Sequence, residues 1–405
     1  MHRRRAIRDS ASRRVEAGAE AFAEFIREET NGGKLLLAAT ALALVWANVA
    51  HGSYTAVWNA DASLGPGWLE LHLTLGDWVA DGLLARFFFV AGVELKRELT
   101  VGQLADRRAA ALPFFAAAGG MIVPALIAVA LSGGAAARGG AWAIPVATDI
   151  AFALGVLALV GSSLPAGVRV LLLSLAVIDD LAAIALIAAL FTSGLSALWL
   201  TGGLLAAALY WLALRARVDR AWLLWALAVV AWICIHASGV HATVTGIVLG
   251  LLTPVRPRAN GEAKSPSERF EHRLHPVSAG IVVPVFALAA AGIPLAAAGD
   301  ALTDAIALGV FAGLLAGKFL GVLGGAWLAV RAGIGALPDD ISWSDVVPVA
   351  VLAGIGYTVS LLIVRLSLTD VQAQQRASLA VLAASALASL AALALLRMRG
   401  RAHVP

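Results

Sequence analysis

Charged residues are scarce in this chain, and that scarcity decides its class. Lys, Arg, Asp and Glu make up only 14% of the 405 residues, whereas 60% are hydrophobic. A soluble protein of this length could not bury so much apolar surface, so the composition predicts a polytopic membrane protein. The formal charge of +4 fits basic loops that hold such a protein in the membrane, and we expect no nucleic-acid partner.

Cysteine and long hydrophilic segments are rare as well. Cys234 is the single cysteine and lies in an apolar stretch, which excludes a disulfide framework and a cysteine-based metal site. The longest hydrophilic insertion, 255–275, is too short to fold as a soluble domain. Residues 1–30 lack the apolar core of a signal peptide. Their apolar residues recur at helical spacing and predict a basic amphipathic arm on the cytoplasmic membrane surface.

Apolar segments that can cross a bilayer fill the rest of the chain. We predict one all-α membrane domain over 31–400 and a cytoplasmic tail at 401–405. Lys and Arg gather in alternate loops, such as 215–220 and 255–273, which places both termini in the cytoplasm. The twelve predicted spans are 34–50, 78–97, 112–131, 142–161, 168–191, 196–214, 221–235, 239–253, 276–291, 305–330, 346–366 and 377–396.

The first external loop has a different pattern. Residues 68–76, "WLELHLTLG", alternate apolar and polar side chains after a "GPG" turn, and 54–58, "YTAVW", offer a second arm. We predict a small β-hairpin over 54–76, with an irregular loop as the alternative. A hairpin alone is marginally stable in water, so it predicts a covering surface such as a second copy of the chain, hence a homodimer.

Four charged side chains lie deep inside predicted spans. They are Asp149, Asp179, Asp180 and Lys318. An ionised side chain at the centre of a membrane helix costs about 2.5–3.5 kcal/mol, so such residues point to a cavity, a partner or a function. On a helix the neighbours Asp179 and Asp180 face different directions, so one can line an ion cavity while the other meets Lys318. The alternative is a buried structural ion pair.

Two predicted spans, the fourth and the eleventh, are interrupted. Pro145 and the Thr148–Asp149 pair break "AIPVATDIAFALG", and Gly354 and Gly356 precede Thr358 in "VLAGIGYTVSLLIV". Interrupted helices at corresponding positions predict inverted repeats, here spans 3–5 and 10–12, around a binding site at the bilayer midplane. Glycine-mediated packing of an ordinary helix is the alternative for the second segment.

A third group of charges lies at the predicted cytoplasmic ends of two spans. Histidine titrates near physiological pH, so charges at a cavity mouth can sense cytoplasmic protons, although ordinary interfacial charges are the more frequent case. The candidate pH-sensing residues are Glu94, Arg97 and Glu98 in "VAGVELKRELTVG", and Glu271, His272 and His275 in "ERFEHRLHP".

At these motifs the sequence resembles the NhaA-type sodium/proton antiporter family over nearly its whole length. The resemblance rests on "FFFVAGVELKREL", "GGMIVPALIA", "AIPVATDIAFALGVLALVG", "LAVIDDLAAIALIA", "HASGVHATVTGIVLG", "RFEHRLHP", "AGLLAGKFLG" and "GIGYTVSLLI". It implies twelve helices, with broken helices 4 and 11 crossing at the site. It also implies that Asp180, with Asp179, binds Na⁺ or Li⁺ and H⁺ alternately, with Thr148 and Asp149 at the crossing and Lys318 paired with Asp179.

The resemblance further implies pH activation by the candidate pH-sensing residues and dimerisation through the loop hairpin. Three residues depart from the family's usual pattern: Ala290 stands in place of Asn, Arg86 in place of an apolar residue, and Tyr357 in place of Phe. These departures bear on ion preference and pH dependence, while the carboxylates themselves are unaffected.

The expected function is secondary transport in a bacterial inner membrane, without cofactor or enzymatic chemistry. Sodium is a hard cation that prefers the oxygen ligands supplied by Asp179, Asp180 and Thr148. Two protons per sodium, an electrogenic exchange, is our hypothesis. A cation channel is one alternative, although the carboxylates form a single asymmetric set. An intramembrane aspartyl protease that uses Asp149 and Asp180 is another, although the chain lacks a Gly-x-Gly-Asp element.

Overall fold

The computed structural model describes residues 29–64, 71–160, 164–192, 194–218, 220–257 and 264–403, and almost all of this part is helical. The basic arm predicted for 1–30 lies almost entirely outside these residues. The first half contains α2 (Glu29–Val49), α3 (His51–Trp58), α4 (Leu75–Asp77), η2 (Trp78–Leu83), α5 (Leu84–Thr100), η3 (Gln103–Ala105), α6 (Arg107–Leu131), η4 (Ala135–Val146), α7 (Ile150–Ala158) and α8 (Ala166–Leu190). The second half contains α9 (Ala197–Arg215), α10 (Ala221–Ala237), α11 (Thr243–Leu252), α12 (Pro266–Val277), η6 (Ser278–Val282), α13 (Val283–Ala290), η7 (Leu295–Ala297), α14 (Ala298–Ala301), α15 (Ala305–Ala312), η8 (Gly313–Gly317), α16 (Lys318–Arg331), α17 (Trp343–Leu352), α18 (Tyr357–Ser367) and α19 (Val371–His403).

In the described part of the chain, eight helices are long and apolar enough to cross a membrane. The pair α17 and α18, bent by 44° at its break, makes a ninth if it counts as one span. Helices α10 and α11 are apolar but shorter. The continuous helical segment formed by α4, η2 and α5 ends in charged residues and is not among these candidates. The chain is therefore a multi-pass membrane protein. Helical segments occupy all twelve predicted positions, although nine at most meet this length and composition test.

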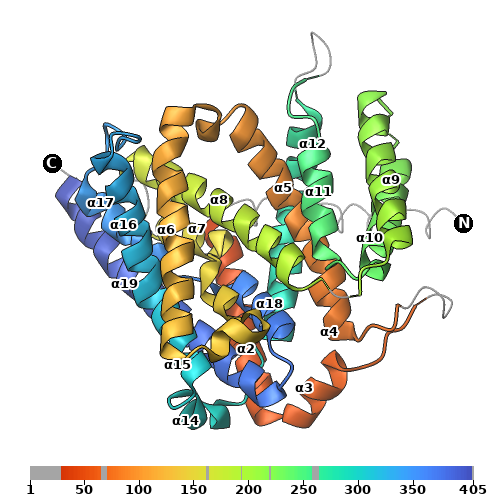
Figure 1. Cartoon of the computed structure of the whole chain (residues 1–405), viewed down its shortest axis with the longest axis horizontal. Coiled ribbons are helices and arrows are strands. Elements are labelled where there is room, and N and C mark those ends of the chain that lie inside the picture. Colours follow the sequence, from red (N-terminus) through yellow and green to blue (C-terminus); the bar gives the residue numbers. More distant parts are fainter. Residues whose placement is uncertain are drawn as a thin grey trace, which may run out of the picture.

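The helices surround a centre made of short segments. Figure 1 shows α9 and α10 standing together at one side and α19 at the opposite side, with α2, α7 and α18 between them. Helix α7 packs against α2 and α8, and α18 packs against η4 and α19. The two interrupted segments therefore lie inside the molecule, where side chains from both can face each other.

The predicted β-hairpin is wrong in its first arm. Residues 51–58 form helix α3, because Tyr54 is buried there and its hydroxyl donates to the carbonyls of Leu288 and Ala289 at 2.9 and 2.7 Å. Residues 60–64 and 71–75 do run antiparallel, joined by backbone hydrogen bonds and one bridge between Asp61 and Thr74. No β-strand is assigned among the described residues, so the expected hairpin-mediated homodimer has no support from them.

Glycines bring α6 and α16 into backbone contact. A Cβ atom built on Gly119 would lie 2.1 Å from the carbonyl oxygen of Gly321, and one on Gly321 would lie 2.1 Å from that of Gly119. Small residues allow this approach between membrane helices, where van der Waals contact rather than the hydrophobic effect holds helices together. The contact fixes α16, and with it Lys318, against α6.

We expect Gly321→Val to destabilise the protein by about 1–3 kcal/mol, because the added side chain must push two backbones apart. Gly324→Val is the matched control, since it lies on the same helix and a Cβ there meets nothing within 4 Å. Thermal unfolding in detergent measures both variants. Equal melting temperatures for the two would show that the α6–α16 contact is not a close one.

Candidate functional site

Both predicted helix breaks are present, and they cross. Helix η4 ends at Val146, Ala147 and Asp149 are extended, and α7 starts at Ile150, while the other break lies between α17 and α18. The backbone N–H of Asp149 donates to the carbonyl of Ile355 at 2.6 Å, and the hydroxyl of Thr148 donates to that of Ala353 at 2.8 Å. The broken segments thus satisfy part of each other's buried backbone, as a membrane interior requires.

Glycine and proline make this crossing possible. A Cβ on Gly354 would lie 2.6 Å from the carbonyl oxygen of Leu314, and one on Gly356 would lie 2.3 Å from the Ser360 hydroxyl. That hydroxyl donates at 2.7 Å to the carbonyl of Ile144, just before Pro145 in η4. Both explanations of this segment therefore hold, because the glycines interrupt the helix and also allow close packing against neighbouring segments.

Asp149 faces the N-termini of two half-helices. Its Oδ1 accepts from the backbone N–H of Phe152 in α7 at 3.0 Å. Its Oδ2 accepts from the N–H and the hydroxyl of Thr358 in α18 at 3.1 and 2.7 Å. A helix N-terminus carries partial positive charge, so one buried carboxylate neutralises both ends. Asp149 is only 2% exposed, and these contacts define it as the anion that holds the crossing together.

Asp179 forms the predicted ion pair with Lys318. The Nζ atom of Lys318 lies 2.6 Å from Oδ2 of Asp179, and both side chains are fully buried. The π-helical segment η8 directly precedes Lys318, and such widened turns are frequent at functional sites. Asp179 Oδ1 has no hydrogen-bond partner among the described residues. Thr148 of the broken segment also lies next to this carboxylate.

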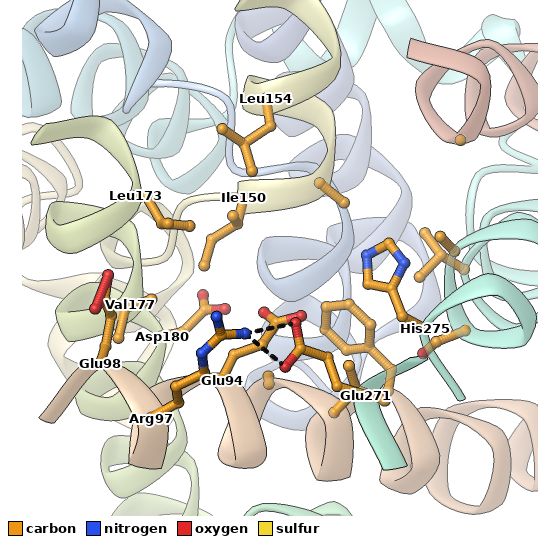
Figure 2. Close-up of a pocket in the computed structure, with 18 of the residues that line it drawn as sticks. Glu94, Arg97, Glu98, Ile150, Leu154, Leu173, Val177, Asp180, Glu271 and His275 are labelled. Atoms are coloured by element: carbon orange, nitrogen blue, oxygen red, sulfur yellow. Dashed lines mark hydrogen bonds and ion pairs between the residues drawn. The ribbon is translucent and has the colours of Figure 1, made fainter. Parts of the chain in front are cut away.

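Asp180 lines a cavity of about 600 Å³. Its neighbours there are Val177 and Leu173 of α8, and Ile150 and Leu154 of α7 (Figure 2). The residue is 5% exposed, and its Oδ1 lacks a hydrogen-bond partner in the described part of the chain. Among the residues that the structure describes, Asp149, Asp179 and Lys318 do not line this cavity. Asp180 is thus the deep carboxylate with access to it.

The mouth of the same cavity carries the six candidate pH-sensing residues. The Nη1 atom of Arg97 lies 3.1 Å from Oε2 of Glu271, and the Arg97 side chain is 47% exposed, which places this pair at the outer end. Glu98 accepts from the N–H of Gln103 at 3.1 Å. Figure 2 shows Glu94 and Asp180 close to this pair. All six line the cavity, namely Glu94, Arg97, Glu98, Glu271, His272 and His275.

The three departures occupy separate environments. The hydroxyl of Tyr357 hydrogen-bonds that of Thr40, which links α18 to α2. The guanidinium of Arg86 lies 5.9 Å from the ring centre of Trp225 in α10. Ala290 ends α13. Sequence reasoning missed the Thr40 contact, because nothing in the pattern around residue 40 signals a partner 317 positions away.

We expect Lys318→Met to destabilise the protein by about 3–5 kcal/mol, because it leaves the buried Asp179 carboxylate without its partner. Adding Asp179→Leu removes that carboxylate and recovers most of the loss. Arg376→Met is the control, since its pair with Asp304 is partly exposed and contributes about 0–1 kcal/mol. Thermal unfolding in detergent compares the variants. A double variant no more stable than Lys318→Met would contradict the pairing.

Comparisons with known proteins find one family over most of the chain. The model of a family described as "Na+/H+ antiporter 1" matches residues 23–396. The chain is 54% identical over 385 residues to Na⁺/H⁺ antiporter NhaA 1 of Saccharopolyspora erythraea, covering 94% of this chain and 92% of that protein. It is 52% identical over 382 residues to an NhaA antiporter of Nocardia farcinica, covering 94% and 91%. It is 51% identical over 388 residues to NhaA 2 of Rhodococcus jostii, covering 94% of each.

Proposed function

The chain belongs to the Na⁺/H⁺ antiporter family, and on that premise we propose that it exchanges cytoplasmic Na⁺ or Li⁺ for external H⁺ at Asp180. The observation that carries this site is the cavity, which reaches Asp180 and none of the other deep charges that the structure describes. Loops rich in Lys and Arg flank the mouth of the cavity, which supports a cytoplasmic mouth and an inward-facing conformation.

Competition between sodium and protons for one carboxylate couples the two fluxes. Asp180 binds either a proton or a sodium ion, and each reduces its charge in a medium where an uncompensated carboxylate is costly. The unpartnered Oδ1 atoms of Asp180 and of the adjacent Asp179, together with the Thr148 hydroxyl, supply the oxygen ligands that sodium prefers. Asp149 contributes through the crossing, and Lys318 holds Asp179 in place.

Transport then requires the ion-loaded site to open to the other side. We assign spans 3–5 and 10–12, about 112–191 and 305–396, to a moving core unit, and the remaining helices to an interface unit. Twelve spans with both termini in the cytoplasm of a bacterial inner membrane complete this topology. Two protons per sodium, one carried by Asp180 and one by Asp179, with net charge moved in each cycle, is the stoichiometry we propose.

The alternatives gain nothing from the geometry. A protease would need Asp149 and Asp180 free to activate one water molecule, whereas three donors already occupy the oxygens of Asp149. A channel would carry sodium without proton exchange, and the transport assay below separates the two.

Asp180→Asn should abolish exchange, because the neutral amide takes up no proton at the pH of transport and binds sodium more weakly than a carboxylate does. In inside-out vesicles with a proton gradient, adding sodium should collapse the gradient for the wild type and leave it unchanged for the variant. Asp370→Asn, which removes a 65% exposed carboxylate, should behave as the wild type. Exchange that survived Asp180→Asn would refute the site, and sodium flux in the wild type without proton movement would favour a channel.

The charges at the mouth should set the pH of activation. Glu271→Gln removes a negative charge beside Arg97, so protons bind less readily to the other groups at the mouth. Because we propose that loss of these protons activates exchange, the pH of half-maximal exchange should shift toward acid by about half a pH unit. Asp339→Asn, at an exposed loop position away from the cavity, is the control. Sodium-induced collapse of the gradient, measured from pH 6 to 9 (about seven values), gives the profile. Overlapping profiles would remove these residues from regulation.

A further inference from the structure

An ion pair joins α18 to the start of the second span, at the opposite end of the molecule from the cavity mouth. Arg365 Nη2 lies 2.8 Å from Oδ1 of Asp77, and its Nη1 donates to the carbonyl of Gly76 at 3.4 Å. About a third of each side chain is exposed. Neither residue belongs to the ion site or to the cavity lining. The pair is therefore separate from the transport site.

Asp77 is held in place before Arg365 reaches it. Its Oδ2 accepts from the N–H and the hydroxyl of Thr74 at 3.1 and 2.6 Å, and its own N–H donates back to that hydroxyl at 3.1 Å. This capping box fixes the carboxylate at the N-terminus of α4 and leaves Oδ1 directed to Arg365. The interface side of the contact is therefore rigid.

The position of this pair differs from that of the other ion pairs. Among the described residues, Lys318–Asp179 and Arg376–Asp370 lie within the core unit assigned above, and Arg376–Asp304 and Arg399–Asp345 join core residues to positions directly next to its ends. Arg97–Glu271 and His241–Asp81 lie within the interface unit. Arg365 is on α18 in the core, whereas Asp77 precedes α5 in the interface unit. Relative movement of the two units would stretch this contact, because its two ends belong to different units.

We propose that Arg365 and Asp77 form an external latch that holds the core against the interface unit in the inward-facing state and separates when the site opens outward. The proposal rests on the proposed antiport and its two units. Arg365 and Asp77 are thus positioning residues, which act on the equilibrium between the two states. Separation also frees the Asp77 carboxylate beside Asp81 of η2, so that the departing sodium meets negative charge where the arginine stood.

The test compares the half-saturating sodium concentrations on the two sides of the membrane. A merely structural role of the ion pair would leave their ratio unchanged. A partly exposed ion pair shifts a two-state equilibrium by at most about fivefold. Arg365→Gln should therefore raise the half-saturating sodium concentration on the cytoplasmic side and lower it on the external side, by about two- to fivefold in total ratio. Asp77→Asn, which keeps an oxygen for the Thr74 cap, should shift the ratio in the same direction, and adding Arg365→Gln to it should shift the ratio no further. Arg376→Gln, which breaks a pair within the core, is the matched control.

Cross-linking tests the same contact without relying on its energy. In a Cys234→Ser background, a short bifunctional thiol reagent joining Asp77→Cys to Arg365→Cys should stop exchange, and reductive release should restore it. The pair Asp304→Cys with Arg376→Cys, joined in the same way, should exchange normally. A cross-linked latch that exchanges at the uncross-linked rate, or an unchanged affinity ratio in Arg365→Gln, would overturn the proposal. A wild type without any exchange would instead overturn the proposed antiport.

Discussion

The rest of the site depends on one carboxylate placed between the N-termini of two half-helices. Helices α7 and α18 both begin at the crossing, so without Asp149 two partial positive charges would face each other inside the membrane. Asp149 accepts hydrogen bonds from both helices, so its negative charge offsets both positive ends and holds the two helices together. The unwound backbone on either side can therefore persist at a depth where water cannot satisfy it.

The three deep aspartates consequently have different tasks. Asp149 is committed to the half-helices, and Asp179 is bound by Lys318, which leaves Asp180 as the carboxylate that lines the cavity. A carboxylate that exchanges ions must have few protein partners for its negative charge, so that a proton or sodium can bind to it. The charges around it must be paired by protein groups, because unpaired buried charge opposes folding. Placing Asp179 and Asp180 side by side on α8 separates these requirements, because adjacent helical positions face different directions.

Much of this arrangement can be predicted from the sequence, for local reasons. The isolated aspartates in apolar runs, the proline and glycine breaks, and the pairing of Lys318 with one of two adjacent aspartates each follow from the cost of charge or unsatisfied backbone in a membrane. The choice of Asp179 as the partner is an implication of the family resemblance. The role of Asp149 as a cap depends on the angle at which two distant segments cross, which no local pattern encodes. The first hairpin arm failed because burial of Tyr54 against Leu288 and Ala289 outweighs the strand propensity of "YTAVW".

Proton release on sodium binding tests the central claim most directly. Purified protein in weakly buffered detergent, near the middle of its active pH range, would receive sodium chloride while a pH indicator records the free protons. Exchange at one carboxylate site predicts that protons appear as sodium binds, that release saturates with sodium, and that choline chloride releases none. Saturable sodium binding without proton release would contradict the account, because the two ions would then not share a site.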